Sequence, residues 1–377
     1  MTVEELGERV KDPNFLNALQ AGVNVWIKDI HRVTKLERIE KMPPNTETIH
    51  EIKFWLELDV ELNHIDKQLK ENEAECTLNI LKQAKRFHAT ASFDTDTIGL
   101  KKAIEKGKWQ LTSQNLDTNV GLVNNYKPLM KDFPINDLLA SSEISQLSNA
   151  LKAIFEHLKK TKNAHYPIPR YLQLVEAISR DLCNKVLEIL HSKALMGLSF
   201  TEFEKITSDC RSLFTIWEDQ FNKFREVIRE LARKRRQDDV PLRINVDNKQ
   251  LQERIMNVRN FRKQHEELFE VIKRVLPADE GGKQSLEEMQ SAYENVKVVD
   301  PLVMSRDGTE TWKRAMKVYD EKIDKVETHI KEQLRDRLSM AKNANEMFRV
   351  FSKFNALFYR PRVSCPIVVR AVLTGFT

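Results

Sequence analysis

The side chains that could bind a metal or carry acid–base chemistry are scattered along this sequence. Its nine histidines include no pair spaced one helical turn apart, as metal ligands on a helix commonly are. The segment "RKQHEELFE" begins like a zinc metalloprotease motif, but Phe269 stands where the second histidine would be. We therefore predict that His265 is a surface histidine on a helix.

Motifs for phosphate binding and for nucleophilic catalysis do not occur either. A P-loop needs the pattern GxxxxGK[ST] after a strand, and the dipeptide Gly107-Lys108, followed by Trp109, is the nearest approach to it. The patterns GxGxxG, HExxH and GxSxG are absent from the sequence. We therefore predict no catalytic, cofactor-binding or metal-binding residue, no cofactor and no enzymatic activity.

Acidic pairs and cysteines add no chemistry of their own. Neighbouring acids such as Asp94 and Asp96, or Glu287 and Glu288, are common on solvated segments. The four cysteines form no CxxC pair, so reduced thiols in a cytosolic protein are the expected state. These cysteines are Cys76, Cys183, Cys210 and Cys365.

Charge and composition exclude several classes of protein. A net charge of +5 with 31% charged residues is too small to indicate a nucleic-acid partner. The basic run Arg233–Arg236 is followed two residues later by Asp238, which favours the basic end of a long helix over a nuclear localisation signal. The first residues show no signal-peptide pattern, and the longest apolar run is too short for a membrane-spanning helix.

The spacing of apolar residues predicts helices along most of the chain. Asp12 and Pro13 suit the N-cap and first position of a helix that runs to about Val33. The cleanest seam steps by 3 and 4 through Ile144, Leu147, Leu151, Ile154 and Leu158. Further helices are expected from about Thr46, after Pro167 and Pro169, over 200–236 and 251–275, and after a cap at Thr309, with a loop at 278–285.

These helices must cover one another. Only 10 glycines in 377 residues leave little provision for tight turns, and no alternating series indicates a strand. An isolated amphipathic helix is unstable in water and needs a neighbour over its apolar face. We therefore predict an all-α fold, an elongated series of antiparallel helical bundles with long amphipathic helices.

An aromatic stripe carries the first family signature. Phe348, Phe351, Phe354 and Phe358 hold helical spacing within "AKNANEMFRVFSKFNALFYRP". This segment resembles the MFRxFSxFNALFxRP signature in the N-terminal tail of class-1 cytoplasmic dynein heavy chains. Further segments resemble the same tail and occur in the same order as in the family. They are "VEELGERVKDPNFLNALQAGVNVWI", "RFHATASFDTDT", "YKPLMKDFPINDLL", "LVEAISRDL", "FRKQHEELFEVIKRVL", "AYENVKVVD" and "YDEKIDKVETHI".

The resemblance implies a non-catalytic scaffold in the tail of a minus-end-directed microtubule motor. In this family the heavy chain combines a ring of AAA+ modules, a microtubule-binding stalk and a helical tail. The tail carries intermediate and light intermediate chains and docks on dynactin and cargo adaptors. The implied location is the cytoplasm and the microtubule cytoskeleton, with neither nucleic acid nor membrane as a partner. From the residues alone, an unrelated helical adaptor or tether that binds partner helices remains the alternative, and the partner-binding residues stay unknown.

Departures from the family pattern suggest a truncated or mis-spliced fragment. We expect a first bundle over 1–140, a second over 141–276 and the start of a further bundle over 277–362. The stretch 107–121 and the C-terminal residues 363–377, expected to be disordered, do not match the family. We hypothesise that both are intron-derived, because their first codons can contain the splice-donor consensus GTAAGT. The chain begins after the family's dimerisation region and ends before its motor, so we expect homodimers of the full-length protein only. The aromatic stripe should pack in a bundle whose other helices follow later, and here it should be partly uncovered.

Overall fold

The computed structural model describes residues 12–35, 38–39, 41–43, 45–83, 108–160, 166–235, 248–275 and 280–353. Within these ranges every regular element is a helix, so the all-α prediction is confirmed. Unit 1 comprises residues 1–141, 146–182 and 217–246, and unit 2 comprises 142–145, 183–216 and 247–377. The bundle boundaries predicted at residues 140, 276 and 362 stay a prediction.

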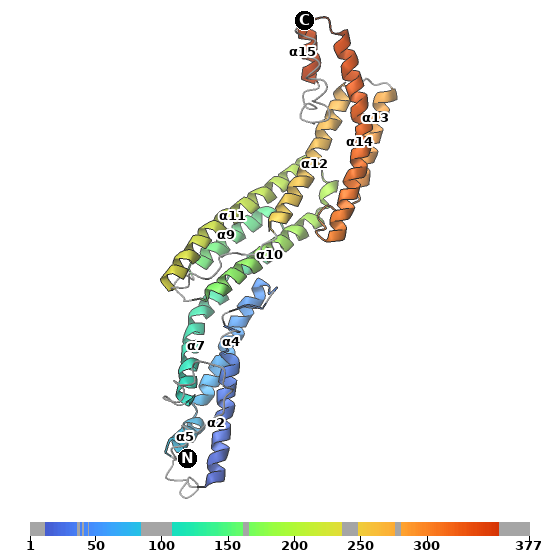
Figure 1. The fold of residues 1–377 in the computed structure, drawn as a ribbon. Helices are drawn as coiled ribbons and strands as arrows, with labels where there is room; N and C mark the ends of the chain where they lie inside the picture. Colours follow the sequence, from blue (N-terminus) through green and yellow to red (C-terminus); the bar gives the residue numbers. More distant parts are fainter. Residues whose placement is uncertain are drawn as a thin grey trace. The chain divides into compact units, whose positions relative to one another are not determined.

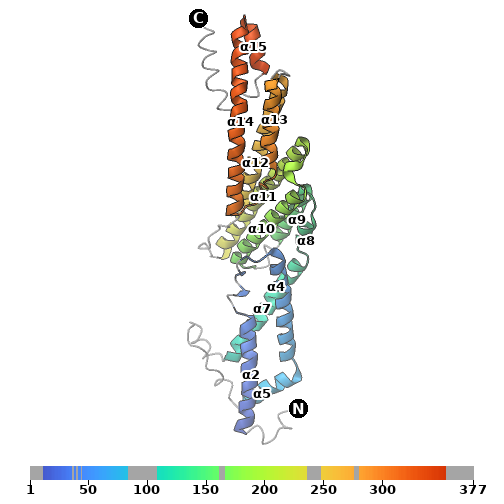
Figure 2. The same cartoon turned by 90° about the vertical axis from the view of Figure 1, so that its right-hand side faces the viewer.

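In unit 1, the helices α2, α4, α5 and α7 lie side by side (Figures 1 and 2). The helices that contribute to this unit are α2 (Pro13–Val33), α4 (Thr48–Leu69), α5 (Asn72–Gln83), α7 (Lys108–Lys131), α8 (Ile135–Ala140), most of α9 (Ile144–Lys160), the first part of α10 (Ile168–Ser192) and the last part of α11 (Phe200–Arg235). The ends of α2 and α11 agree with the sequence to within one residue, and α4 begins two residues later than predicted.

Local signals in the sequence explain how α2 and α9 form. The Asp12 carboxylate accepts a hydrogen bond from the Asn14 amide at 2.9 Å, and Pro13 opens α2, as predicted. All five apolar residues of the predicted α9 seam are buried. The rest of the unit's core follows the same logic, since each helix turns its apolar stripe toward its neighbours.

The stretch 107–121 is helical from Lys108 and forms the first part of α7. Its side chains enter the core of unit 1, because Leu116 is 2% exposed and Trp109 packs against a cluster that contains Val23 and Ile80. The hypothesis that this stretch is intron-derived stays a prediction, which sequencing of the transcript tests.

In unit 2, α13 lies alongside α14, and α12 packs against α13 (Figures 1 and 2). The elements that contribute to this unit are the end of α10, the 3-10 turn η3 (Leu195–Gly197), the start of α11, α12 (Asn248–Val275), α13 (Glu280–Lys297), α14 (Arg306–Met340) and α15 (Ala344–Lys353). Rings from α12, α13 and α14 meet in the core, where Phe261 lies 4.9 Å from Tyr319 and 6.4 Å from Tyr293 between ring centroids.

Two predictions of element ends in this unit are wrong. The cap of α14 is Ser305, whose hydroxyl accepts from the Gly308 amide at 3.1 Å, while Thr309 lies inside the first turn. The predicted loop at 278–285 is helical from Glu280, because packing overrides the weak helix propensity of two glycines. A Cβ on Gly281 would lie 3.5 Å from the His329 ring on α14, an ordinary van der Waals contact, which shows how closely the two helices pack here.

The aromatic stripe on α15 is partly uncovered, as expected. No residue of α15 is buried, and Phe348 is 74% exposed. Phe351 is half-buried, and Phe354 and Phe358 lie outside the described residues.

Candidate functional site

The one histidine that resembled part of a metal motif lies in a core and not on the surface. His265 is 6% exposed, its ring stacks on Tyr293 with centroids 4.4 Å apart, and its Nδ1 lies 3.0 Å from the Tyr319 hydroxyl. The prediction of a surface histidine is therefore wrong. Its position on the apolar stripe of α12 was visible in sequence, but the tyrosine that satisfies its ring comes from another helix.

The residue types that ligate metals form no metal-binding cluster in the described part of the chain. In the described part of the chain, no group of three or more histidine, cysteine or acidic side chains is placed to hold a metal ion. Glu287 and Glu288 lie on the outer part of α13, and Asp94, Asp96 and Cys365 lie outside the described residues. Among the described helices, none has the length and apolarity needed to cross a bilayer.

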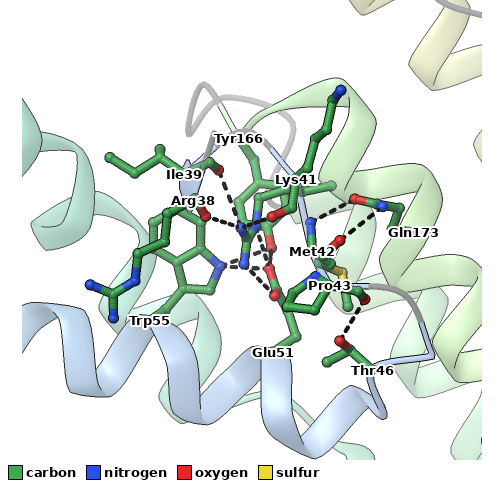
Figure 3. A network of polar contacts seen from close by, with 11 residues as sticks. Arg38, Ile39, Lys41, Met42, Pro43, Thr46, Glu51, Trp55, Tyr166 and Gln173 are labelled. Atoms are coloured by element: carbon green, nitrogen blue, oxygen red, sulfur yellow. Dashed lines mark hydrogen bonds and ion pairs between the residues drawn. The ribbon is translucent and has the colours of Figure 1, made fainter. Parts of the chain in front are cut away.

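Unit 1 contains a buried polar centre in which Arg170 meets Glu51, Trp55 and Tyr166. Figure 3 labels Glu51, Trp55 and Tyr166 in this centre. Arg170 donates to the Glu51 carboxylate twice, from Nε at 2.8 Å and from Nη2 at 2.5 Å. The Trp55 indole donates to the same carboxylate at 2.7 Å, and the Tyr166 hydroxyl donates to it as well. Both charged side chains are 1% exposed, so this is a fully desolvated, bidentate ion pair.

The polar centre holds the connection between α2 and α4. The Nη1 of Arg170 donates to the carbonyl oxygens of Arg38 at 2.8 Å and Lys41 at 2.9 Å. Gln173, one turn later on α10, accepts from the Met42 amide at 2.7 Å and donates back to the Met42 carbonyl at 3.2 Å (Figure 3). These bonds satisfy backbone groups that an irregular segment cannot satisfy by itself.

Aromatic rings surround the ion pair. The Arg170 guanidinium lies 4.3 Å from the Phe54 ring centroid and 4.9 Å from that of Trp55. Trp55 and Tyr126 meet edge to face at 4.8 Å. Burial raises the pKa of the Tyr126 hydroxyl from 10.0 to about 12. Burial and the neighbouring Glu51 carboxylate raise the pKa of Tyr166 well above 10.0.

This arrangement is suited to holding helices in place and not to catalysis. The Glu51 carboxylate accepts hydrogen bonds from protein donors. Arg170 donates its hydrogen bonds to Glu51 and to the carbonyl oxygens of the linker between α2 and α4. Sequence reasoning missed the pair. Glu51 lies one turn before Trp55 on the buried face of a helix, and this position could have indicated a buried acid. No local pattern indicated that its partner lies 119 residues away.

Hollows on the described surface of unit 2 include the following two. One, of about 280 Å³, is lined mainly by apolar residues of 190–197 and 297–302. Its lining also includes His191, whose Nε2 lies 3.0 Å from the Asp300 carboxylate. The other, of about 260 Å³, lies between the end of α14 and α15. Neither combines a nucleophile with a base or places acids around a common point, which is what a catalytic pocket would show.

Packed amphipathic helices define the described part of this chain as a helical-bundle protein. Its sequence matches the family described as Dynein heavy chain, N-terminal region 1, over residues 16–368. The chain belongs to this family and is an N-terminal dynein heavy chain fragment, so the predicted resemblance is confirmed.

Several similar curated proteins are cytoplasmic dynein heavy chains. The chain is 46% identical to that of Dictyostelium discoideum and 44% identical to that of Drosophila melanogaster. Identity to the Caenorhabditis elegans heavy chain is 39%. Each of the three matches covers 96% of this chain and 8% of the relative. The chain therefore corresponds to a small part of the tail region and not to the motor.

Proposed function

We propose that this chain is a non-catalytic scaffold segment in the tail of a cytoplasmic dynein heavy chain, a minus-end-directed microtubule motor. The family match over residues 16–368 carries the proposal. Long helices packed along their lengths suit a segment that transmits force and holds other chains in place. Both α11 and α14 exceed the usual globular helix of about 11–12 residues by a wide margin, at 36 and 35 residues.

The proposed partners are the dynein intermediate chain and light intermediate chain, with dynactin and cargo adaptors reached through the full-length tail. The proposed location is the cytoplasm, on microtubules through the complete complex. The names of the similar proteins support this location. The polar centre would serve this role by keeping α4 and α10 in register when the tail is loaded.

The alternative was an unrelated helical adaptor or tether that binds partner helices. The family match removes the reason to treat the chain as unrelated. A role in binding partner helices is compatible with the tail and is part of the proposal.

Co-purification tests the assignment to the dynein complex. An epitope-tagged version of this chain, expressed in cells of its source, should bring down the intermediate chain in an immunoblot. A tagged helical protein of similar size serves as the control. Calorimetric titration with MgATP should give no binding heat. Absence of the intermediate chain from pull-downs of both this chain and the intact parental protein would contradict the scaffold assignment, and MgATP binding would contradict its non-catalytic part.

A further inference from the structure

The end of α14 and the helix α15 form a groove lined by apolar residues, by bases and by one acid. On the α14 side the groove is lined by Arg337, Met340 and Ala341. On the α15 side it is lined by Glu346, Arg349, Val350 and Lys353. Its volume of about 260 Å³ is below the range of about 300–1,000 Å³ typical of small-molecule sites, which favours a protein side chain as the occupant.

The one acid in this α14–α15 groove is engaged in capping α15. The Glu346 carboxylate accepts from the Lys342 amide at 2.8 Å and from the Asn343 side chain at 3.4 Å. In return, the Glu346 amide donates to the Asn343 side-chain oxygen at 2.9 Å. This reciprocal cap turns the carboxylate toward the start of the helix. The exposed charged residues of the groove on α15 are the bases Arg349 and Lys353.

The basic residues on α15 are spaced to meet another helix. Arg349 and Lys353 are both exposed and lie one helical turn apart on one face. Met340, which is 76% exposed, and the half-buried Val350 are apolar residues that line the same groove as these bases. An exposed methionine next to a hollow is a common feature of surfaces that accept varied helical partners.

We propose that the α14–α15 groove binds an acidic amphipathic helix of a partner chain. An aliphatic side chain of that helix enters the hollow beside Met340 and Val350, and carboxylates one turn apart pair with Arg349 and Lys353. Helix-in-groove docking with charge complementarity is an established mode of recognition. A lipid bilayer would satisfy the bases but would leave the hollow empty, so the hollow favours the helix. The inference deepens the proposed scaffold role and rests on it.

The test is a binding titration with a defined probe. The probe is a fluorescent peptide of about 20 residues, long enough to form a helix, with two glutamates one turn apart beside a leucine. A matched peptide carries glutamine at both glutamate positions. Binding to the 377-residue chain is followed by fluorescence anisotropy at low and high salt. We expect saturable binding of the acidic peptide, weakened by salt because exposed charges are screened, and clearly weaker binding of the glutamine peptide.

Charge-reversal variants locate the site. Arg349→Glu with Lys353→Glu should weaken binding about tenfold, since it removes two exposed ion pairs and adds like-charge repulsion. The control, Lys317→Glu with Lys325→Glu, makes the same charge change at exposed positions of α14 outside the groove and should change affinity less than about twofold. Circular dichroism of each variant shows that the helices are retained.

Several outcomes would overturn the proposal. The acidic peptide could fail to bind, or it could bind the two double variants with equal affinity. The glutamine peptide could also bind as tightly as the acidic peptide. Binding of phosphatidylserine vesicles but not of the peptide would assign the surface to a membrane and would also refute it. None of these results affects co-purification of the intermediate chain, so failure of this inference is distinguishable from failure of the proposed function.

Discussion

Breaking the buried ion pair in unit 1 should destabilise this chain more than most single substitutions. In Glu51→Ala, the Arg170 guanidinium remains buried without its counter-ion, since both side chains are 1% exposed in the native fold. Its Nη1 still bonds to linker carbonyls, but Nε and Nη2 lose their acceptor. Removing one partner of a buried pair typically costs about 3–5 kcal/mol.

That cost is large compared with the stability of a domain. A domain is stable by about 5–15 kcal/mol, so unit 1 would lose a substantial fraction of its stability. With a urea slope of about 2 kcal/mol per molar, a loss of about 4 kcal/mol lowers the unfolding midpoint by about 2 M. Replacing both partners by methionine should recover much of the loss, because no uncompensated charge is then buried.

Urea unfolding followed by circular dichroism measures the midpoint, and hydrogen exchange with mass spectrometry reports the linker. Exchange of the Lys41 and Met42 amides should rise in Arg170→Met, which removes the donor to the Lys41 carbonyl. In Gln173→Leu, the Met42 amide loses its acceptor, so exchange should rise there too.

The matched control breaks an ion pair of similar length at the surface of unit 1. Lys223 and Asp219 lie 2.7 Å apart, but both are more than half exposed. Asp219→Ala should cost less than about 1 kcal/mol, because exposed pairs are screened by solvent. If Glu51→Ala destabilises the chain no more than Asp219→Ala, the argument from desolvation is wrong.

Three further predictions concern glycines, a tyrosine and a thiol. Gly308→Ala should destabilise α14 by about 1–3 kcal/mol in thermal unfolding, because the new Cβ would lie 2.6 Å from the Val303 carbonyl oxygen. Gly22→Ala should be stabilising, because no atom lies within 4 Å of the new Cβ. Equal effects of the two substitutions would contradict this prediction. Burial raises the pKa of the Tyr126 hydroxyl to about 12. The unfolded chain therefore loses this proton first, so the free energy of unfolding should fall as pH rises from 10.0 toward 12, and less steeply in Tyr126→Phe. A free energy of unfolding that stays constant over this pH range would refute the prediction. Burial also raises the pKa of the Cys210 thiol to about 12, so iodoacetamide should label it only after unfolding, and rapid labelling of the native chain in a mass spectrum would show otherwise.

Local patterns were reliable where neighbours in sequence decide the structure. The α9 seam, the Asp12 cap and the end of α2 follow from spacing and capping within a few residues. The sequence predicted Thr309 as the N-cap of α14, but the N-cap is Ser305. Several residues near the start of a helix can serve as its N-cap, and the conformation of the preceding turn selects one of them.

Long-range packing decided the features that sequence reasoning missed. His265 is buried by two tyrosines from other helices. Tyr293 stacks on its ring, and the Tyr319 hydroxyl lies within hydrogen-bond distance of its Nδ1. The residues 280–285 are helical because α14 lies against them, which local propensity does not register.

By itself, the sequence determined an all-α chain of amphipathic helices and its membership of the dynein heavy chain tail, since periodicity and motif order are properties of the chain alone. Only the tertiary structure decided that Glu51 meets Arg170, and that bases on α15 gather beside a hollow at the end of α14. The physical reason is that such contacts depend on which faces of distant helices are brought together. Burial then turns an ordinary acid or base into a charge that requires a partner.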